Sequence, residues 1–392
     1  MTGRYRNFWL VGAFLLVILA IGLALQSALW ACVAAALLGL VGVVTLRGNR
    51  WRSGALLATA LALSLVALDL FAGLLTPKAM NMGVVTRTIP QWWPPPDPIL
   101  GFRPKPDSEA TATATWGSEL VYRQTYHFDS AAARVTPPAP DATDTYLFIG
   151  DSFIFGQGLS DDETMPSQFT KQNAPAARSV NLGVPGYGPN HLVRAFEAGL
   201  LDRYTDRKVK AVVTWIIPAH LQRVTGDGSW LGSSPRYVLE NGKLRFTGTF
   251  NEHRWRDPMA GLHYLLGQHF AFIDAIGQRQ RQEEQIELFL AMMAKLQAEA
   301  RAKFDAPLVI VYSWPDEQTR HRYGDSKVEQ PLLVETLVRL RKLGAPMVGE
   351  SPTTFGRDPK TLAIPHDGHP SALATDLIAA AVKKALQGSQ RP

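Results

Sequence analysis

Two short motifs, far apart in the sequence, carry side chains that together could perform nucleophilic catalysis. Gly150-Asp151-Ser152 follows the apolar run 146–149, and Asp367-Gly368-His369 lies near the C-terminus. A serine hydroxyl becomes a good nucleophile only when a base takes its proton, and histidine is a common base. A carboxylate that accepts the imidazole Nδ1 proton fixes the tautomer and stabilises the imidazolium. Ser152, His369 and Asp367 are therefore candidates for a catalytic triad.

Each motif by itself is also typical of an ordinary turn, so the segments around it decide between the two interpretations. The apolar run 146–149 predicts a short buried strand, which places Ser152 at the carboxyl end of that strand. In open α/β sheets, ligands bind outside the carboxyl ends of the strands. Gly150 permits a sharp turn beside the hydroxyl. His369 lies in a loop that opens a predicted final helix.

From residue 145 onward, apolar runs typical of strands alternate with longer segments typical of helices. We predict strands at residues 145–149, 179–184, 210–217 and 307–312, and helices at 165–172, 190–203, 277–304, 328–343 and 371–387. This alternation predicts an α/β domain with a parallel sheet between two helical layers. An insertion at about residues 219–260 contains a hairpin whose turn is Asn241-Gly242. We interpret the insertion as a lid or rim over the site.

An early strand-end Gly-Asp-Ser and a late Asp-x-His before the last helix resemble the SGNH or GDSL hydrolase superfamily. The resemblance covers residues 145–387. It implies a flavodoxin-like, three-layer αβα fold in which Ser152 is the nucleophile and Asp367 and His369 complete the triad. The usual spacing in the family is Asp-x-x-His. The shorter Asp-x-His of this sequence is similar to that of polysaccharide-modifying relatives.

The oxyanion of a tetrahedral intermediate needs hydrogen-bond donors, and losing one donor can cost about 3 to 4 kcal/mol. Residues 181–188 resemble the family's second block, in which Gly186 matches the glycine whose N–H joins that of Ser152. Residues 216–223 depart from the third block, because they lack the asparagine of its usual Gly-x-Asn-Asp. His220 is a candidate replacement donor or a structural loop histidine. With this asparagine missing, three activities remain consistent with the sequence: ester hydrolysis, acyl transfer to an acceptor other than water, and binding without catalysis.

Other polar clusters have simpler interpretations, and we predict neither a metal nor a cofactor. Asp161-Asp162-Glu163 is most simply a set of acidic side chains in the first turn of a helix. His366 and His369 lack a third ligand at a recognisable spacing. Cys32 is the only cysteine, which excludes disulfides within the chain and cysteine-based metal sites.

Three apolar segments at the N-terminus predict a membrane anchor, at residues 8–25, 28–46 and 54–75. The formal charge is +6 and the pI is about 9.4, but several arginines flank these segments, which indicates topology rather than nucleic-acid binding. The flanking arginines are Arg4, Arg6, Arg47, Arg50 and Arg52. The positive-inside rule then predicts a cytoplasmic N-terminus in the inner membrane and a periplasmic C-terminal domain. Asp69, within the third segment, we interpret as hydrated or neutral.

We therefore predict an anchor at residues 1–76, a proline-rich linker with peripheral strands at 77–144 and an SGNH-like domain at 145–392. Trp92 and Trp93 in the linker could rest at the membrane interface. The expected activity is that of a serine esterase that acts, through an acyl-enzyme, on O-acyl groups of envelope or exported glycans or on lipid esters. One alternative is an O-acyltransferase for an exported polysaccharide, working beside a multispan acyltransferase. Another is a non-catalytic binding subunit of an envelope assembly.

Overall fold

The computed structural model describes residues 28–75, 83–91, 93–173, 175–204, 208–267, 270–276, 278–314, 330–349 and 355–388. The chain divides into two units, which are described separately. Unit 1 contains Met1–Lys78 and Arg254–Arg281, and unit 2 contains Ala79–His253 and Gln282–Pro392. Unit 1 therefore takes its residues from two separate parts of the chain.

A five-stranded parallel sheet forms the centre of unit 2, with the strand order β12-β11-β8-β6-β7. The strands are β6 (Asp144–Gly150), β7 (Ala177–Gly183), β8 (Lys208–Ile216), β11 (Leu308–Tyr312) and β12 (Met347–Gly349). The runs are apolar because both faces of the sheet are buried. On β6, Leu147 and Ile149 face one core and Phe148 faces the other.

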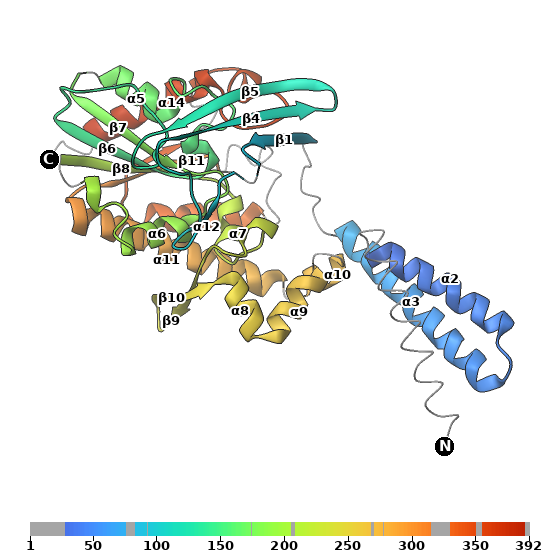
Figure 1. Cartoon of the computed structure of the whole chain (residues 1–392). Helices are drawn as coiled ribbons and strands as arrows, with labels where there is room; N and C mark the ends of the chain where they lie inside the picture. The colour runs from blue at the N-terminus through green and yellow to red at the C-terminus, as the bar shows by residue number, and fades with distance from the viewer. Residues whose placement is uncertain are drawn as a thin grey trace. The chain divides into compact units, whose positions relative to one another are not determined.

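Helices cover both faces of this sheet, which gives the three layers that the alternating pattern predicts (Figure 1). One face carries α5 (Met165–Asn173) and α14 (Ala372–Gly388). The other carries α6 (Pro189–Glu197), α11 (Gln278–Phe304) and α12 (Gln330–Arg341). The parallel α/β architecture is thus confirmed, although β12 has only three residues and the sequence analysis missed it.

The helix predicted at residues 190–203 ends early, at Glu197. Gly199 adopts a positive φ of 68°, which breaks the helix, and a 3₁₀ turn follows at Asp202–Tyr204. The predicted hairpin is present as β9 (Pro235–Glu240) and β10 (Lys243–Thr249). Asn241 and Gly242 between them both have positive φ values, as a tight hairpin turn requires.

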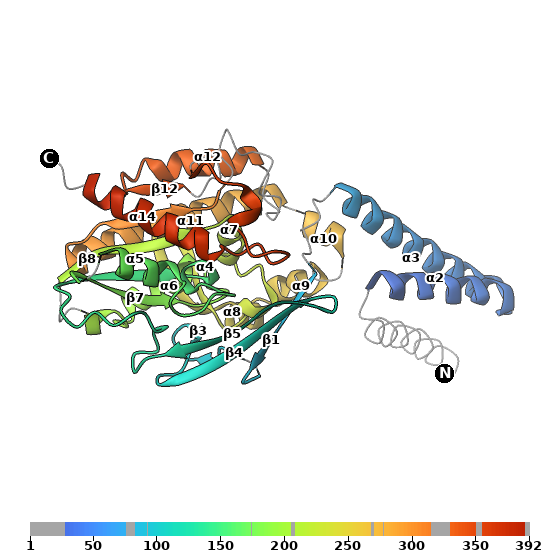
Figure 2. The same ribbon diagram turned by 90° about the horizontal axis from the view of Figure 1, so that it is seen from above.

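Residues 77–144, predicted as a proline-rich linker with peripheral strands, lie almost entirely in unit 2 and contain several strands. β1 (Val84–Ile89), β4 (Ser108–Trp116) and β5 (Glu119–Phe128) form an antiparallel sheet, and β2 (Pro96–Asp97) pairs with β3 (Gly101–Phe102). β4 and β5 make a long hairpin (Figure 2). Trp93 packs against Tyr126, Phe128 and Phe155, so its expected place at a membrane surface is wrong. Trp92 lies outside the described residues.

Arg134 links the segment after β5 to residues 155–161, which follow Ser152, through hydrogen bonds. Its side chain is fully buried, and it donates hydrogen bonds to the carbonyl oxygens of Phe155, Gly156 and Leu159 at 2.6 to 2.7 Å. Its Nε donates to Asp161 Oδ1 at 2.8 Å. Three backbone acceptors and one carboxylate thus satisfy a cation that burial would otherwise destabilise.

In unit 1, α2 (Ala28–Thr45) packs against α3 (Asn49–Leu75). Asn49–Ala72 is long and apolar enough to cross a membrane, whereas the apolar stretch Leu29–Thr45 in α2 is shorter. The first predicted span, at residues 8–25, lies outside the described residues. Three further helices follow the hairpin: α8 (Phe250–Arg256), which crosses the boundary between the units, α9 (Pro258–Gly267) and α10 (Ala271–Ala275).

Replacing Arg134 should test how far the segment after Ser152 depends on this one side chain. We expect Arg134→Met to lower the free energy of unfolding by about 3 to 5 kcal/mol, because three carbonyl groups and Asp161 lose their buried partner. Chemical denaturation of the full chain in detergent measures the change. The matched control Arg123→Met removes an exposed arginine of β5 and should shift stability by less than about 0.5 kcal/mol. Equal shifts for the two variants would contradict the expectation.

Candidate active site

Ser152 lies at the first position of α4 (Ser152–Phe155), immediately beyond the end of β6. Asp151 caps this helix, because its Oδ1 accepts a hydrogen bond from the backbone N–H of Phe153 at 3.0 Å. A Cβ at Gly150 would lie 2.5 Å from Ile154 Cγ1, so only glycine fits the turn without a shift. The strand end and the helix cap together fix the direction of the serine side chain.

The structure brings the three predicted triad side chains together. Ser152 Oγ lies 2.8 Å from His369 Nε2, and His369 Nδ1 is hydrogen bonded to Asp367 Oδ1. The backbone N–H of His369 also donates to Asp367 Oδ1, at 3.2 Å. Ser152 and Asp367 are buried, while the His369 side chain is 17% exposed. A substrate can therefore reach the serine while the carboxylate stays shielded from water.

A tight loop before α14 holds Asp367 and His369 in this position. Ile364 N–H donates to the carbonyl of His369 at 2.7 Å, and Gly368 N–H donates to the carbonyl of Ile364 at 3.0 Å. His366 and Gly368 both have positive φ values. His366 does not join the triad: its ring stacks on Trp116 with 4.1 Å between the centroids. The β4–β5 hairpin thus supports the loop from the side.

Gly186 lies in the loop that follows β7, next to the end of β6. The backbone N–H of Val184 donates to the carbonyl of Gly150 at 3.0 Å, which ties this loop to the strand that precedes Ser152. Gly186 has a φ of 89°, and a Cβ there would lie 2.9 Å from Trp230 Nε1. No described residue accepts a hydrogen bond from the backbone N–H of Ser152 or of Gly186. Both donors are thus available to a ligand.

Asp151 is hydrogen bonded to two side chains of the segment that follows β8. Its Oδ2 lies 3.0 Å from His220 Nε2 and accepts a hydrogen bond from Arg223 Nη1 at 2.8 Å. Arg223 Nη1 also donates to the carbonyl of Tyr187 at 2.6 Å. Both side chains come from α7 (Ala219–Arg223), which follows β8. His220 Nε2 is thus bonded to Asp151, and His220 Nδ1 is buried without a partner among the described atoms.

Electrostatics favour an ionised Asp151 beside a neutral His220. Burial alone would raise the pKa of Asp151, but electrostatic attraction to His220 and Arg223, together with hydrogen bonds from His220 and the Phe153 N–H, lowers it to about 2. Burial lowers the pKa of His220 despite the neighbouring carboxylate. A neutral His220 then donates its Nε2 proton to Asp151, and the positive charge that balances the carboxylate is that of Arg223.

Arg223 is the site residue that the sequence analysis did not select. It bonds to the residue before Ser152 and to the residue after Gly186, so one guanidinium nitrogen links the segments that carry both candidate oxyanion donors. The available signal was its position just beyond the third strand, where the family's polar third block was expected. Because the sequence analysis looked for an asparagine in residues 216–223, it did not select the arginine there.

The acidic residues 161–163 have structural partners. Asp161 accepts from Arg134 and lies 2.7 Å from His127 Nδ1, Asp162 pairs with Lys171, and Glu163 accepts from Ser160. Within the described ranges, no group of three His, Cys, Asp or Glu side chains is arranged to hold a metal ion.

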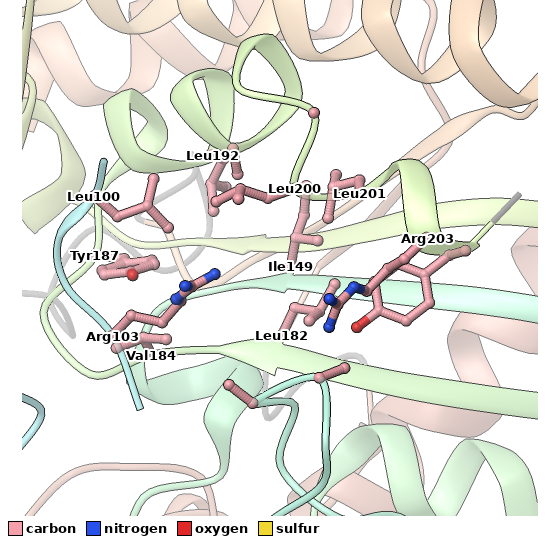
Figure 3. Close-up of a pocket in the computed structure, with 15 residues that line it drawn as sticks. Leu100, Arg103, Ile149, Leu182, Val184, Tyr187, Leu192, Leu200, Leu201 and Arg203 are labelled. Atoms are coloured by element: carbon pink, nitrogen blue, oxygen red, sulfur yellow. The ribbon is translucent and has the colours of Figure 1, made fainter. Parts of the chain in front are cut away.

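A separate cavity of about 180 Å³ lies under the loop that contains Tyr187. Leu182, Leu192 and Leu200 are among its apolar lining residues, and Figure 3 shows the guanidinium groups of Arg103 and Arg203 extending into it. None of the three triad residues lines this cavity. Its volume is below the several hundred cubic ångströms of a typical ligand pocket. This cavity is therefore separate from the candidate site at the strand ends.

Comparison with known proteins gives structural neighbours only. No family model and no curated protein matches the sequence. Solved structures that resemble the chain include a lipase/acylhydrolase from Enterococcus faecalis, with 12% identity and a TM-score of 0.36, which covers 64% of this chain and 98% of its own. Esterase EstA from a Pseudoalteromonas species has 12% identity and a TM-score of 0.34, covering 62% of this chain and 97% of its own. A member of the lipolytic G-D-S-L family from Veillonella parvula has 11% identity, a TM-score of 0.34 and the same coverage of 62% and 97%.

Proposed function

We propose that the chain is a serine esterase that cleaves O-acyl esters through a covalent acyl-enzyme. The observation that carries this proposal is the continuous hydrogen-bonded series Ser152, His369 and Asp367, in which Ser152 Oγ lies 2.8 Å from His369 Nε2. This order of hydroxyl, imidazole and carboxylate is the arrangement that activates a serine for attack on an acyl carbon. Two unoccupied backbone donors nearby, on Ser152 and Gly186, provide the complementary oxyanion site.

The reaction follows from these positions. Ser152 Oγ attacks the acyl carbon while His369 Nε2 takes its proton, and Asp367 stabilises the resulting imidazolium through Nδ1. The backbone N–H groups of Ser152 and Gly186 hold the negative oxygen. His369 then returns the proton to the departing alcohol oxygen, which leaves the acyl group on Ser152. A water molecule, deprotonated by His369, attacks the acyl-enzyme and releases the acid and the free serine.

Arg223 acts as a positioning residue in this scheme, in place of the missing third-block asparagine. Its hydrogen bonds to Asp151 and to the Tyr187 carbonyl hold the two donor-bearing segments at a fixed separation. Because a misplacement of about 1 Å can cost about 100-fold in rate, such a clamp is important even without contact to the oxyanion.

The substrate that we propose is an acylated glycan. Trp230 is 52% exposed and donates through Nε1 to the carbonyl of Gly186, and Trp116 is 45% exposed while it stacks on His366. Two indole rings thus flank the oxyanion loop and the histidine loop. An exposed indole offers a flat apolar face, which suits the C–H groups on one face of a sugar ring.

The same surface supports a second candidate, an O-acyltransferase in which a sugar hydroxyl rather than water accepts the acyl group from Ser152. Proton transfers through His369 are unchanged, because the acceptor hydroxyl gives up a proton just as water does. A multispan acyltransferase that supplies the acyl group is the partner we propose for this case.

We propose that the esterase is anchored in the inner membrane by three spans, with the N-terminus in the cytoplasm and unit 2 in the periplasm. The apolar helix α3 supports an anchor, and α2 packs beside it. The arginines before the first predicted span and between the second and third support the orientation.

Labelling with a fluorophosphonate tests the proposed chemistry directly. We expect the full chain in detergent to react covalently at Ser152, with Ser152→Ala unlabelled and ester hydrolysis reduced at least about 10³-fold. Mass spectrometry of the labelled peptide identifies the site. Folded protein that does not react would refute catalysis and leave a binding subunit. Rapid labelling with slow hydrolysis that a sugar acceptor accelerates would identify the transferase.

Replacing Arg223 tests whether its two hydrogen bonds position the segments that carry the proposed oxyanion donors. We expect Arg223→Met to lower kcat about 100-fold while KM changes only a few-fold, because ground-state binding does not depend on the separation of the two donors. Arg223→Lys should recover part of kcat, since an ammonium group can also bond to a carboxylate and a carbonyl. If Arg223 only stabilised the fold, the free energy of unfolding would fall while kcat per folded molecule stayed unchanged in both variants, which circular dichroism and kinetics together would reveal.

Removing an indole tests the glycan assignment. Trp230→Ala should raise KM for an O-acetylated oligosaccharide about 10-fold and leave KM for a small aryl acetate within about 2-fold, because only the sugar contacts the ring. Trp51→Ala, which changes an exposed tryptophan in unit 1, is the control. Equal effects on both substrates would show that Trp230 supports the loop and does not bind sugar.

A further inference from the structure

A second apolar segment, outside the predicted spans, has no role in the proposed reaction. Residues 258–273, which follow the β9–β10 hairpin, read Pro-Met-Ala-Gly-Leu-His-Tyr-Leu-Leu-Gly-Gln-His-Phe-Ala-Phe-Ile and contain no Asp, Glu, Lys or Arg. The structure assigns Arg254–Arg281 to unit 1, together with α2 and α3. The segment therefore belongs to the same unit as the predicted anchor, although residues Ala79–His253 of unit 2 lie between them in the sequence.

The helix α9 in this segment presents its apolar side chains outward. None of its residues is buried. Met259 is 72% exposed, Leu262 48% and Leu265 57%, and the neighbouring Trp255 is 86% exposed. Soluble proteins rarely expose a contiguous apolar surface of this kind, so it indicates contact with another apolar phase.

The helix beside the segment and the length of the segment indicate that this apolar phase is lipid. The next helix, α10, packs against α3, which is the helix long and apolar enough to cross a membrane. The uncharged stretch of residues 258–273 is shorter than the about 20 residues that a transmembrane helix needs. The ten residues of α9 extend only about 15 Å. A segment that is apolar, too short to span and next to a spanning helix fits the surface of the bilayer.

Aromatic and basic side chains occur where such a location needs them. Trp255, Tyr264, Phe270 and Phe272 are the aromatic residues, and such rings are favoured at the headgroup level. Arg254 and Arg256 precede the uncharged stretch, and Arg279 and Arg281 follow it. The Arg254 guanidinium lies over the ring of Tyr264, 3.3 Å from its centroid. Arginines at both ends suit the phosphate groups of lipids.

We propose that residues 254–267 and 270–276 form an interfacial membrane element, in which α9 lies along the bilayer surface with Met259, Leu262 and Leu265 in the lipid. The proposal rests on the membrane anchoring proposed above. Its occupant is a lipid surface rather than a second copy of the chain, because α10 packs against the apolar helix α3 and arginines flank the uncharged stretch 258–273 on both sides.

Site-specific quenching by lipids tests this placement. Cys32 is the only cysteine, so Cys32→Ser gives a background for single-cysteine variants. Leu262→Cys and Leu265→Cys report on α9, Leu61→Cys reports on the middle of α3, and Val338→Cys in α12 is the control, with an exposure of 45% close to the 48% of Leu262. Each full-length variant carries an environment-sensitive fluorophore and is reconstituted into phosphatidylcholine–phosphatidylglycerol vesicles. The vesicles contain lipids with a nitroxide near the headgroup or deep in the acyl chain.

We expect the fluorophores at positions 262 and 265 to be quenched at least about 2-fold more strongly by the shallow nitroxide than by the deep one, and position 61 to show the reverse. Val338→Cys should respond to neither. If position 61 is quenched but positions 262 and 265 respond as weakly as the Val338→Cys control, the interfacial element is refuted and the proposed anchor is retained. Absence of quenching at position 61 as well would overturn both. Shielding of positions 262 and 265 that depends on protein concentration and not on lipid would show a second copy instead, and would also overturn the proposal.

Discussion

A single buried carboxylate holds the candidate site together. Asp151 has no exposed surface; Arg223 balances its charge, and His220 and the backbone N–H of Phe153 also donate hydrogen bonds to it. A buried charge that loses its partners is destabilising by several kcal/mol, so the loop after β8 has to meet the turn after β6. Arg223 extends the same constraint to the loop after β7 through the Tyr187 carbonyl. Three strand ends are thus brought to one point by one ionised group.

This arrangement fixes the backbone of the candidate site. In the segment that follows β8, the side chains of His220 and Arg223 are directed toward Asp151. The donors that remain are backbone N–H groups, whose positions depend on how rigidly their loops are held. Arg223 and the close packing at Gly150 and Gly186 provide that rigidity.

The sequence predicted what depends on local pattern and missed what depends on contacts between distant residues. Ser152 follows an apolar run typical of a strand, and His369 precedes a pattern typical of a helix. Both features are visible in short windows of sequence. The alternating apolar runs likewise placed four of the five parallel strands. Arg223 and Arg134 could not be identified in this way, because their roles arise from carbonyl groups far away in the sequence. Trp93 lies in a proline-rich stretch typical of a linker, and only the β4–β5 hairpin shows that its ring has a core to join.

The division of unit 1 between two parts of the chain has a consequence for proteolysis of the molecule. One proteolytic cut between Leu75 and Gly83 would separate the N-terminal helices from β1 in the covalent chain. Arg254–Arg281 would still be continuous with β10 and α11, and α10 would still pack against α3. A nicked molecule therefore keeps unit 2 attached through side-chain packing, and shedding a free fragment requires that packing to separate as well.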